Sequence, residues 1–295
     1  MHILLTGADG FTGRHFARWA QAQGWSVVAL QADLCDAEAV AAEVAALGSG
    51  AQGRVPDAVL HLAAISYVAH EQPLQLYAVN VLGTEHLLQA LCRWPVPPQR
   101  VLLASSANVY GNAPVSPIAE TQAPAPVNHY AISKLAMEHM ARLYAAQLPL
   151  VWARPFNYTG PGQGEQFLLP KLVRHFHERR PRLELGNTAV EREFNDVRMV
   201  CEAYGRLLLR GEPGQTYNVC SGQPWALTAV LALLEQLTGH PAEVVVNPAL
   251  VRPHEVLRLC GDPARLHACV GPLPQPALAD TLGWMLAEVA ERSSA

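Results

Sequence analysis

The first half of the chain alternates short apolar runs with longer segments whose apolar residues follow a helical period. The apolar runs are HILLTG, WSVVAL, DAVLHLAA, RVLLASS and LVWARP. Between them, the pattern predicts one helix through Trp19, one from about Asp36 to Leu47, one from about Asn80 to Arg93 and one from about Tyr130 to Gln147. Continuous apolar strands that alternate with helices are typical of a parallel sheet covered on both faces. We therefore expect an α/β fold with a doubly wound parallel sheet.

Beyond Arg154 this regular alternation ends. The stretch RPFNYTGPGQG is dense in Pro and Gly, PKLVRHFHERRPR predicts a basic helix, and QTYNVCSG returns to strand character. ALTAVLALLEQLTG predicts a helix that ends at Gly239, and VVVNPALVRPHEV is expected to be irregular. We interpret the chain as one doubly wound domain over residues 1–156, to which 187–222 return, and a smaller C-terminal lobe over 157–186 and 223–295.

Composition and charge narrow the class of protein. Of the 295 residues, 50% are apolar and 16% are charged, which is typical of a globular chain. The net charge of −4 argues against a nucleic-acid partner, because phosphate binding needs many unopposed Lys and Arg side chains. No apolar run approaches the ~18 residues of a membrane span, and the chain opens on a strand without a basic leader. The six cysteines lack metal-ligand spacing, so we expect free thiols, no metal site and a cytoplasmic protein.

The segment TGADGFTG joins the first strand to the first helix. Its glycines, Gly7, Gly10 and Gly13, allow the backbone to approach a pyrophosphate closely, and the start of the helix supplies free N–H groups. Glycines that serve only tight packing are the alternative. Their position between a first strand and a first helix favours a dinucleotide, bound as in Rossmann-type sheets. We therefore assign the cofactor to the domain over residues 1–156.

The end of the second strand bears on the choice of cofactor. Gln31 stands where NAD enzymes often place an acid for the ribose 2′-OH. This position therefore holds no carboxylate that would repel a 2′-phosphate. Arg14 lies just past the glycine turn. Together these residues favour NADPH, with NADH as the alternative. Asp33 follows so closely that it would either contact the adenine or cap the next helix.

The stretch YAISK places Tyr130 and Lys134 four residues apart, on one face of a helix. A neighbouring ammonium favours the phenolate and brings a pKa of about 10 closer to the working pH, so the pair suits proton transfer. Such a lysine can also bind a ribose hydroxyl. A solvated helix face would explain the same spacing.

A series of short motifs runs along nearly the whole chain: TGADGFTG, HLAA, NVLGT, SSANVYG, YAISK, RPFNYTGPGQ and REFNDV. Their kind and order resemble the short-chain dehydrogenase/reductase superfamily, in its extended branch of NAD-dependent epimerases and dehydratases that modify nucleotide sugars. The resemblance implies that Tyr130 is the catalytic acid/base and that Lys134 is its ribose-binding partner. It also implies that Ser106 binds the substrate oxygen.

The resemblance further implies where the cofactor is held. Asp33 would contact the adenine, Asn80 would lie in a supporting helix, and HLAA would approach the cofactor through its backbone, with His61 in a structural role. The residues expected to bind the cofactor are Gly7, Gly10, Phe11, Thr12, Gly13, Arg14, Asp33, Leu34, Leu62, Ala63, Ala64, Tyr130 and Lys134.

The stretch SSANVYG separates the reactions that this family performs. In its 4,6-dehydratases, the matching stretch carries carboxylates that transfer protons at C5 and C6 of the sugar. Here Ala107 and Asn108 stand at those positions, and neither side chain takes a proton at neutral pH. Elimination of water therefore lacks its acid and its base. Hydride transfer at a carbonyl remains, in a reductase or an epimerase.

Three stretches, RPFNYTGPGQ, LELGNTAVEREFNDVRMVCEAY and VRPHEVLRLCGDPARL, resemble the GDP-mannose branch of the family. They imply a deoxysugar reaction: reduction of the 4-keto group of GDP-4-keto-6-deoxy-D-mannose to GDP-D-rhamnose or GDP-6-deoxy-D-talose. Cationic and amide side chains suit the two phosphates, and others suit guanine or ribose. The expected substrate-binding residues are Ser106, Asn157, Lys171, Asn187, Arg192, Arg252 and Glu255.

Two other functions fit the same motifs. An NDP-sugar 4-epimerase would use the same residues and keep NAD tightly bound, whereas a cofactor-binding sensor would keep the fold and lack catalysis. Retention of Ser106, Tyr130 and Lys134 argues against the sensor. The resemblance also implies a homodimer, in which the helices that begin near Asn80 and Tyr130 pair as a four-helix bundle.

Overall fold

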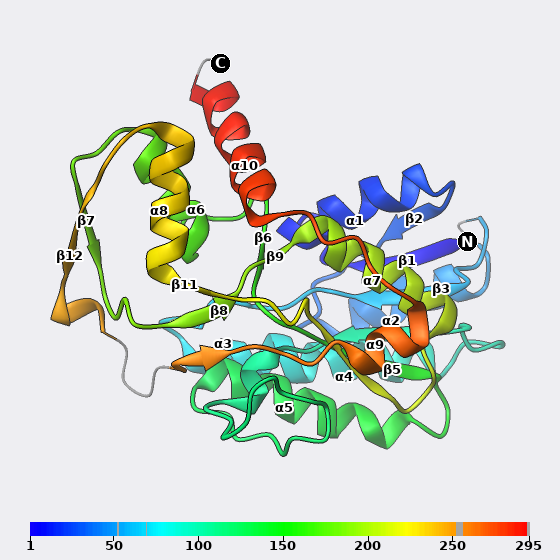
Figure 1. Ribbon diagram of the computed structural model, residues 1–295. Coiled ribbons are helices and arrows are strands. Elements are labelled where there is room, and N and C mark those ends of the chain that lie inside the picture. Colours follow the sequence, from blue (N-terminus) through cyan, green and yellow to red (C-terminus); the bar gives the residue numbers. More distant parts are fainter. Residues whose placement is uncertain (52, 69, 252–255, 294–295) are drawn as a thin grey trace.

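The computed structural model describes residues 1–51, 53–68, 70–251 and 256–293, and its centre is one parallel sheet (Figure 1). The sheet has six strands in the order β10-β5-β4-β3-β1-β2, and every neighbouring pair runs parallel. This arrangement confirms the predicted doubly wound α/β fold, since parallel strands must be joined by crossovers and not by hairpins. The strands are β1 (His2–Thr6), β2 (Ser26–Ala29), β3 (Ala58–His61), β4 (Val101–Ala104), β5 (Leu150–Pro155) and β10 (Thr216–Val219).

Helices cover both faces of this sheet. One face carries α1 (Phe11–Ala22) and α7 (Val197–Arg210), and the other carries α2 (Ala37–Gly48), α4 (Gly83–Leu91) and α5 (His129–Ala141). Along β1, Ile3 and Leu5 are buried in the core under the first group, whereas Leu4 is buried in the core under the second. Successive strand residues point to opposite faces, which is why a strand covered on both sides is continuously apolar.

Two helices differ from their predicted bounds. The helix expected from about Asn80 starts at α3 (Pro73–Tyr77) and passes through a π-helical turn, η1 (Ala78–Leu82), into α4. Proline suits the first turn of a helix, because the N–H that it lacks would have no partner there. The polar residues around Pro73 show no helical pattern of apolar residues, so this start was not predicted. The helix expected to reach Gln147 ends as α5 at Ala141 and continues only as a 3-10 turn, η3 (Arg142–Tyr144).

Capping residues determine two helix ends that the sequence predicted. The side chain of Asp36 accepts the N–H groups of Glu38 (3.1 Å) and Ala39 (3.0 Å) and so begins α2. Gly239 adopts a left-handed conformation with φ +61° and ends α8 (Leu227–Thr238).

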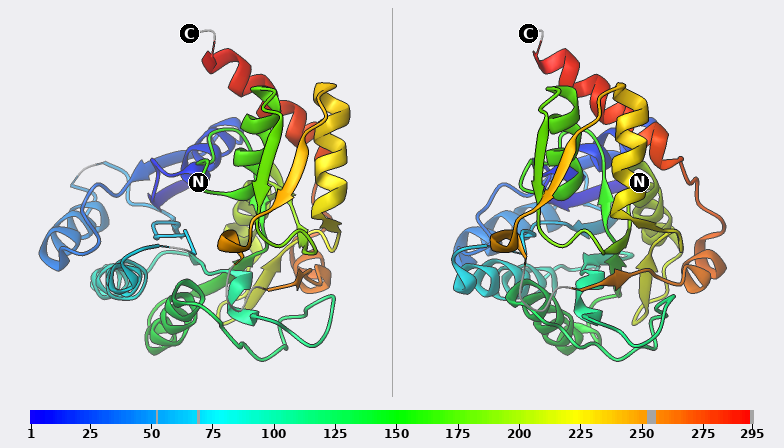
Figure 2. Two further views of the ribbon diagram at one scale, coloured as in Figure 1. Left: turned by 90° about the vertical axis from the view of Figure 1, so that its left-hand side faces the viewer. Right: turned by 60° about the vertical axis from the view of Figure 1, so that its left-hand side comes forward.

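A smaller lobe gathers α6 (Leu168–His177), α8 and α10 (Leu278–Ser293) around an apolar core of its own (Figure 2). Beside them, β7 (Arg182–Leu185) pairs in parallel with β12 (Glu243–Val246). The prediction of an irregular stretch over 244–256 is therefore wrong at its start. A short run of valines becomes a strand only where a partner strand lies beside it, and β7 is remote in sequence.

Short strands link the smaller lobe to the sheet. β8 (Glu191–Glu193) lies between β11 (Pro224–Ala226) and β13 (Arg258–Leu259), and β6 (Tyr158–Thr159) pairs with β9 (Asn195–Asp196). Within 187–222, α7 and β10 thus join the layers of the large sheet, whereas β8 belongs to the three-stranded one. Among the described residues, no helix is both long enough and apolar enough to cross a membrane.

Candidate active site

The turn between β1 and α1 is shaped for close contact with a ligand. Gly7 has φ +69°, in the left-handed region that favours glycine, and a Cβ on Gly13 would lie 2.1 Å from the Gly7 carbonyl oxygen. Gly10 is the N-cap of α1 and makes no side-chain capping bond. Free N–H groups at a helix N-terminus bind anions, so this turn fits the pyrophosphate of a dinucleotide.

The segment after β3, residues 62–64, lies directly against this turn. A Cβ on Gly7 would come within 2.8 Å of the backbone nitrogen of Ala63, which donates to Thr6 Oγ1 at 3.1 Å. The ring of His61 lies between the hydroxyl of Thr6 (2.7 Å) and that of a threonine of α4 (2.8 Å). Burial lowers the pKa of His61 to about 3. A neutral imidazole therefore holds the start of this segment beside the glycine turn.

Ser106, Tyr130 and Lys134 meet at the carboxyl end of β4. Asn128 caps α5 by accepting a backbone N–H of its first turn (2.9 Å), which places Tyr130 in that turn and Lys134 on the same face one turn later. Tyr130 is hydrogen-bonded to Ser106, and the Lys134 ammonium donates to the carbonyl of Ala104 in β4 (2.7 Å). All three side chains are buried, and Tyr130 is the most exposed of them at 7%.

Burial shifts the pKa values of this cluster in opposite directions. It raises the pKa of Tyr130, and the hydrogen bond with Ser106 offsets part of that rise. It lowers the pKa of Lys134 to about 8, against the opposing effect of the Glu138 carboxylate. At neutral pH, Tyr130 therefore holds its proton and Lys134 is mostly charged. These are the states needed to protonate a carbonyl oxygen.

Asn108 determines the direction in which the Ser106 hydroxyl points. Ser106 is the N-cap of a 3-10 turn, η2 (Ala107–Tyr110), and its Oγ accepts both the backbone N–H (3.2 Å) and the side-chain N–H (3.1 Å) of Asn108. A hydroxyl oxygen has two lone pairs, so the O–H proton remains for Tyr130 or for a substrate oxygen. Asn108 thereby makes Ser106 a hydrogen-bond donor.

A buried ion pair supports the cluster from behind. Arg154 of β5 donates through Nε to Glu138 Oε1 (2.8 Å) and through Nη2 to Oε2 (2.6 Å), and Ser105 Oγ donates to the same carboxylate (2.5 Å). The guanidinium carbon of Arg154 also lies 4.8 Å from the centre of the Tyr110 ring. Because Glu138 follows Lys134 by one helical turn, the pair joins the helix of Tyr130 to the sheet. In the sequence, the spacing of Glu138 from Lys134 is the one signal of this pair, and it was not among the predicted site residues.

The predicted cofactor residues at the start of α1 contact the chain that follows β5. Thr12 Oγ1 lies 2.8 Å from the hydroxyl of Tyr158, whose ring stacks on Phe11 with centroids 6.0 Å apart. Arg14 donates to the carbonyl of Gly162 (3.2 Å) and to that of Asp9. The guanidinium of Arg14 is therefore bound beside the glycine turn and the 160–162 segment.

Asp33 and Leu34, the other predicted cofactor residues, follow β2. Asp33 is exposed, and one of its carboxylate oxygens accepts the N–H of Cys35 (2.9 Å). Leu34 is buried under α4, where a Cβ on Gly83 would lie 2.8 Å from the Leu34 Cβ. The Asp33 side chain is thus accessible to a ligand, whereas Leu34 is part of the core.

Four of the predicted substrate residues make hydrogen bonds within their own surroundings. Lys171 donates to a carbonyl of β7 (3.3 Å), and Arg192 donates to a carbonyl just before β13 and to that of its own neighbour in β8 (2.9 Å). Asn187 accepts a nearby backbone N–H (2.9 Å), and the carbonyl of Asn157 accepts the N–H of the first residue of β9 (2.8 Å). Two predicted residues lie outside the described part of the chain: Arg252 and Glu255.

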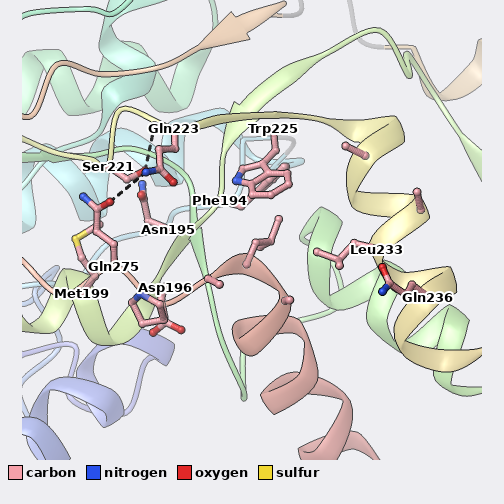
Figure 3. A pocket seen from close by; sticks show the side chains of 16 residues that line it. Phe194, Asn195, Asp196, Met199, Ser221, Gln223, Trp225, Leu233, Gln236 and Gln275 are labelled. Carbon is pink, nitrogen blue, oxygen red and sulfur yellow. Dashed lines mark hydrogen bonds between the residues drawn. The ribbon is translucent and has the colours of Figure 1, made fainter.

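A cavity of about 560 Å³ lies elsewhere, between α8, the start of α10 and the residues around β9 (Figure 3). Phe194 and Trp225 both line it, and Asp196 lines it near the start of α10. Ser106, Tyr130 and Lys134 are absent from its lining. The Asp196 carboxylate is already bonded to Thr281 (2.7 Å) and to Arg198. We therefore place the candidate active site at the end of β4 and not in this cavity.

The glycine turn follows β1 and the Ser–Tyr–Lys cluster lies at the end of β4, with β3 between these two strands in the parallel sheet. Both lie at the carboxyl edge of the sheet, where doubly wound sheets bind their ligands. They define a nicotinamide-dependent oxidoreductase with a Rossmann-type fold. The model of the NAD dependent epimerase/dehydratase family matches residues 3–220, and the chain belongs to that family. The resemblance noted in the motifs is thereby confirmed, and the protein is an NAD(P)-dependent oxidoreductase that acts on a nucleotide sugar.

Two curated relatives align with almost the whole chain. GDP-6-deoxy-D-mannose reductase of Pseudomonas aeruginosa is 34% identical over 301 residues, covering 97% of this chain and 96% of its own. GDP-6-deoxy-D-talose 4-dehydrogenase of Aggregatibacter actinomycetemcomitans is 31% identical over 280 residues, covering 92% of each.

Solved structures give the same picture. RMD from Pseudomonas aeruginosa, complexed with NADPH, superposes with a TM-score of 0.89 at 33% identity and covers 99% of both chains. A presumed epimerase from Burkholderia cenocepacia J2315 superposes with a TM-score of 0.89 at 44% identity, covering 99% of this chain and 98% of its own.

Proposed function

We propose that the protein uses NAD(P)H to reduce the 4-keto group of GDP-4-keto-6-deoxy-D-mannose, forming GDP-D-rhamnose or GDP-6-deoxy-D-talose. The observation that carries this proposal is the buried cluster of Ser106, Tyr130 and Lys134, with Ala107 and Asn108 in place of proton-transferring carboxylates. Both curated relatives are named for GDP-6-deoxyhexoses oxidised or reduced in this way, which supports the choice of substrate.

In the proposed mechanism, the chain holds the sugar carbonyl and supplies its proton. The nicotinamide, when bound, supplies the hydride to C4. Ser106 donates a hydrogen bond to O4, because Asn108 occupies both of its lone pairs. Tyr130 donates a hydrogen bond to O4 and then its proton as negative charge develops there. Lys134 stabilises the resulting phenolate and binds the cofactor ribose.

Dehydration is disfavoured in this site. The Ala107 side chain has no ionisable group, and the Asn108 amide donates a hydrogen bond to Ser106. The Glu138 carboxylate, which lies close to the cluster, is bonded to Arg154 and Ser105 and is buried at 1% exposure. Three of its four acceptor positions are thus occupied and its charge is paired with that of Arg154, so it is poorly placed to take a proton from a sugar carbon.

The smaller lobe is proposed to bind the nucleotide part of the substrate. We assign the GDP contacts to 157–186 and 223–295, together with Asn187 and Arg192 at the start of 187–222, and the cofactor to 1–156 with the remainder of 187–222. Asp33, exposed beyond β2, would contact the adenine. The residues proposed to bind the GDP moiety are Asn157, Lys171, Asn187, Arg192, Arg252 and Glu255.

We further propose a homodimer built as a four-helix bundle. Four large apolar side chains are exposed on the helices that would pair: Leu74 (81%), Leu82 (51%), Ile132 (39%) and Leu143 (76%). They lie on α3, η1, α5 and η3, which are neighbours in the fold. Burying this surface against a second copy would remove it from water. Sedimentation velocity that gave a monomer at working concentration would refute the dimer.

Purified protein mixed with GDP-4-keto-6-deoxy-D-mannose is expected to oxidise a reduced nicotinamide stoichiometrically. The measurement is nicotinamide absorbance, with NADH and NADPH in separate reactions, followed by identification of the sugar product. Omission of the sugar nucleotide is the control. Absence of oxidation with both cofactors would reject the proposed 4-keto reduction.

An NDP-sugar 4-epimerase is the second candidate, favoured by the presumed epimerase from Burkholderia cenocepacia at 44% identity. It would use Ser106, Tyr130 and Lys134 for oxidation and re-reduction of the same carbon. Such an enzyme must retain its NAD between turnovers. Release of stoichiometric NAD from the denatured protein would favour the epimerase over the reductase.

Ser106→Ala is expected to lower kcat/KM by about 100-fold, because a donor aimed at the developing alkoxide is lost. Asn108→Ala should lower it by about tenfold, since one of the two bonds that orient Ser106 disappears while the backbone bond remains. Steady-state kinetics provide both values, and cofactor affinity should stay unchanged. An Asn108→Ala variant with full activity would show that Ser106 needs no such orientation.

A further inference from the structure

A carboxylate from α2 lies on the backbone that follows β2. Glu43 Oε1 accepts the N–H of Gln31 (3.0 Å), and Glu43 Oε2 accepts those of Gln31 (3.2 Å) and Ala32 (2.7 Å). Glu43 is half-buried, and β2 ends at Ala29. Both oxygens of this side chain are therefore fixed at the carboxyl end of the second strand of the sheet.

This place in a doubly wound sheet decides which nicotinamide cofactor is bound. An acid at the end of the second strand accepts a hydrogen bond from the adenosine ribose 2′-OH of NAD(H), whereas a nearby arginine accommodates the 2′-phosphate of NADP(H). Gln31 supplies no charge there. In the structure, Glu43 of α2 places a negative charge beside the backbone of Gln31 and Ala32.

The charge of Glu43 is not neutralised by an ion pair with any described residue. The salt bridges among residues 1–51, 53–68, 70–251 and 256–293 do not include it. Arg14, which the sequence offered for a 2′-phosphate, donates to the carbonyls of Asp9 and Gly162. Arg14, the cation expected beside a 2′-phosphate, thus bonds to other groups. The Glu43 carboxylate accepts the N–H groups of Gln31 and Ala32.

We propose that Glu43 selects the cofactor and makes the protein prefer NADH over NADPH. This inference deepens the proposed function, because it names the reductant of the same site. The 2′-phosphate of NADPH would meet a fixed carboxylate and would have to displace it from Gln31 and Ala32. The 2′-OH of NADH would instead donate a hydrogen bond to that carboxylate.

The structural role of Glu43 can be separated from its charge. Glutamine has the same length and keeps an oxygen that accepts the N–H of Ala32, so Glu43→Gln preserves much of the cap and removes the negative charge. Glu38 lies exposed in the first turn of the same helix. Glu38→Gln removes an equal charge from α2 at a side chain that does not accept the N–H groups of Gln31 and Ala32, and it is the matched control.

The experiment measures dissociation constants for NADH and NADPH by nicotinamide fluorescence, without any sugar nucleotide. The unaltered protein is expected to bind NADH at least about tenfold more tightly than NADPH. Glu43→Gln should tighten NADPH binding about tenfold and weaken NADH binding, whereas Glu38→Gln should leave the ratio unchanged. A melting curve of each variant verifies that it is folded.

Equal or tighter binding of NADPH by the unaltered protein would overturn the proposal, as would an unchanged ratio in a folded Glu43→Gln variant. A second readout needs no variant: raising the salt concentration should narrow the preference, because ions screen the repulsion of the 2′-phosphate. A preference that salt does not alter would contradict a charge-based selection. Failure to reduce the sugar nucleotide while NADH remains the tighter ligand would reject the proposed function alone.

Discussion

Tyr130→Phe is expected to lower kcat for the proposed ketone reduction by about 1,000-fold while leaving the fold and cofactor binding intact. The phenol of Tyr130 is buried, hydrogen-bonded to Ser106 and one helical turn from the Lys134 ammonium. Phenylalanine keeps the ring and its packing but loses the proton and the hydrogen bond. The measurement is single-turnover reduction at saturating cofactor, so that binding does not mask the chemical step.

Tyr144→Phe is the matched control for this prediction. Tyr144 is half-buried in η3, and its hydroxyl donates to Glu85 at 3.2 Å, away from Ser106 and Lys134. The Tyr144→Phe variant loses a hydroxyl of the same kind at another place in the chain, so it should keep its activity. Turnover of Tyr130→Phe close to that of the control would remove Tyr130 from the mechanism.

Arg154→Met is expected to destabilise the protein by about 3–5 kcal/mol. The side chains of Arg154 and Glu138 are 6% and 2% exposed and form two hydrogen bonds with each other. Removing the guanidinium leaves a buried carboxylate whose hydrogen-bond partner among the described residues is the Ser105 hydroxyl. An unpaired buried charge costs far more free energy than the pair contributes, which is why a large effect is expected. Denaturant unfolding measures the change.

The double variant Arg154→Met, Glu138→Leu should be more stable than Arg154→Met alone. It removes the unpaired carboxylate together with its partner, so only packing differences and the lost Ser105 bond remain. The coupling energy from this double-mutant cycle isolates the pair from its surroundings. Additive effects of the two substitutions would show that the buried pair does not act as a unit.

The strands β1 to β5 and the position of Tyr130 and Lys134 on one helix face could be predicted from the sequence because they depend on short-range spacing, whereas Ser106 was grouped with them only through the resemblance to the family. Continuous apolar runs identify strands covered on both faces, and a separation of four residues places Tyr130 and Lys134 on one face of α5. The glycines of TGADGFTG are required by a single tight turn, in which a Cβ on Gly13 would overlap the Gly7 carbonyl. In each case the geometry is local, so the residue types alone are enough to indicate it.

Other features were decided only by the tertiary structure. Glu43 reaches the backbone of Ala32 from eleven residues away, and Arg154 pairs with Glu138 across sixteen, because α2 and α5 pack against the strand ends at particular positions. β12 is a strand because β7 lies beside it. No periodicity in the sequence specifies which face of a helix meets which loop. That choice belongs to the packing of the whole core. Gln31 and Arg14 therefore favoured NADPH in the sequence, whereas the position of Glu43 is the basis on which we propose a preference for NADH.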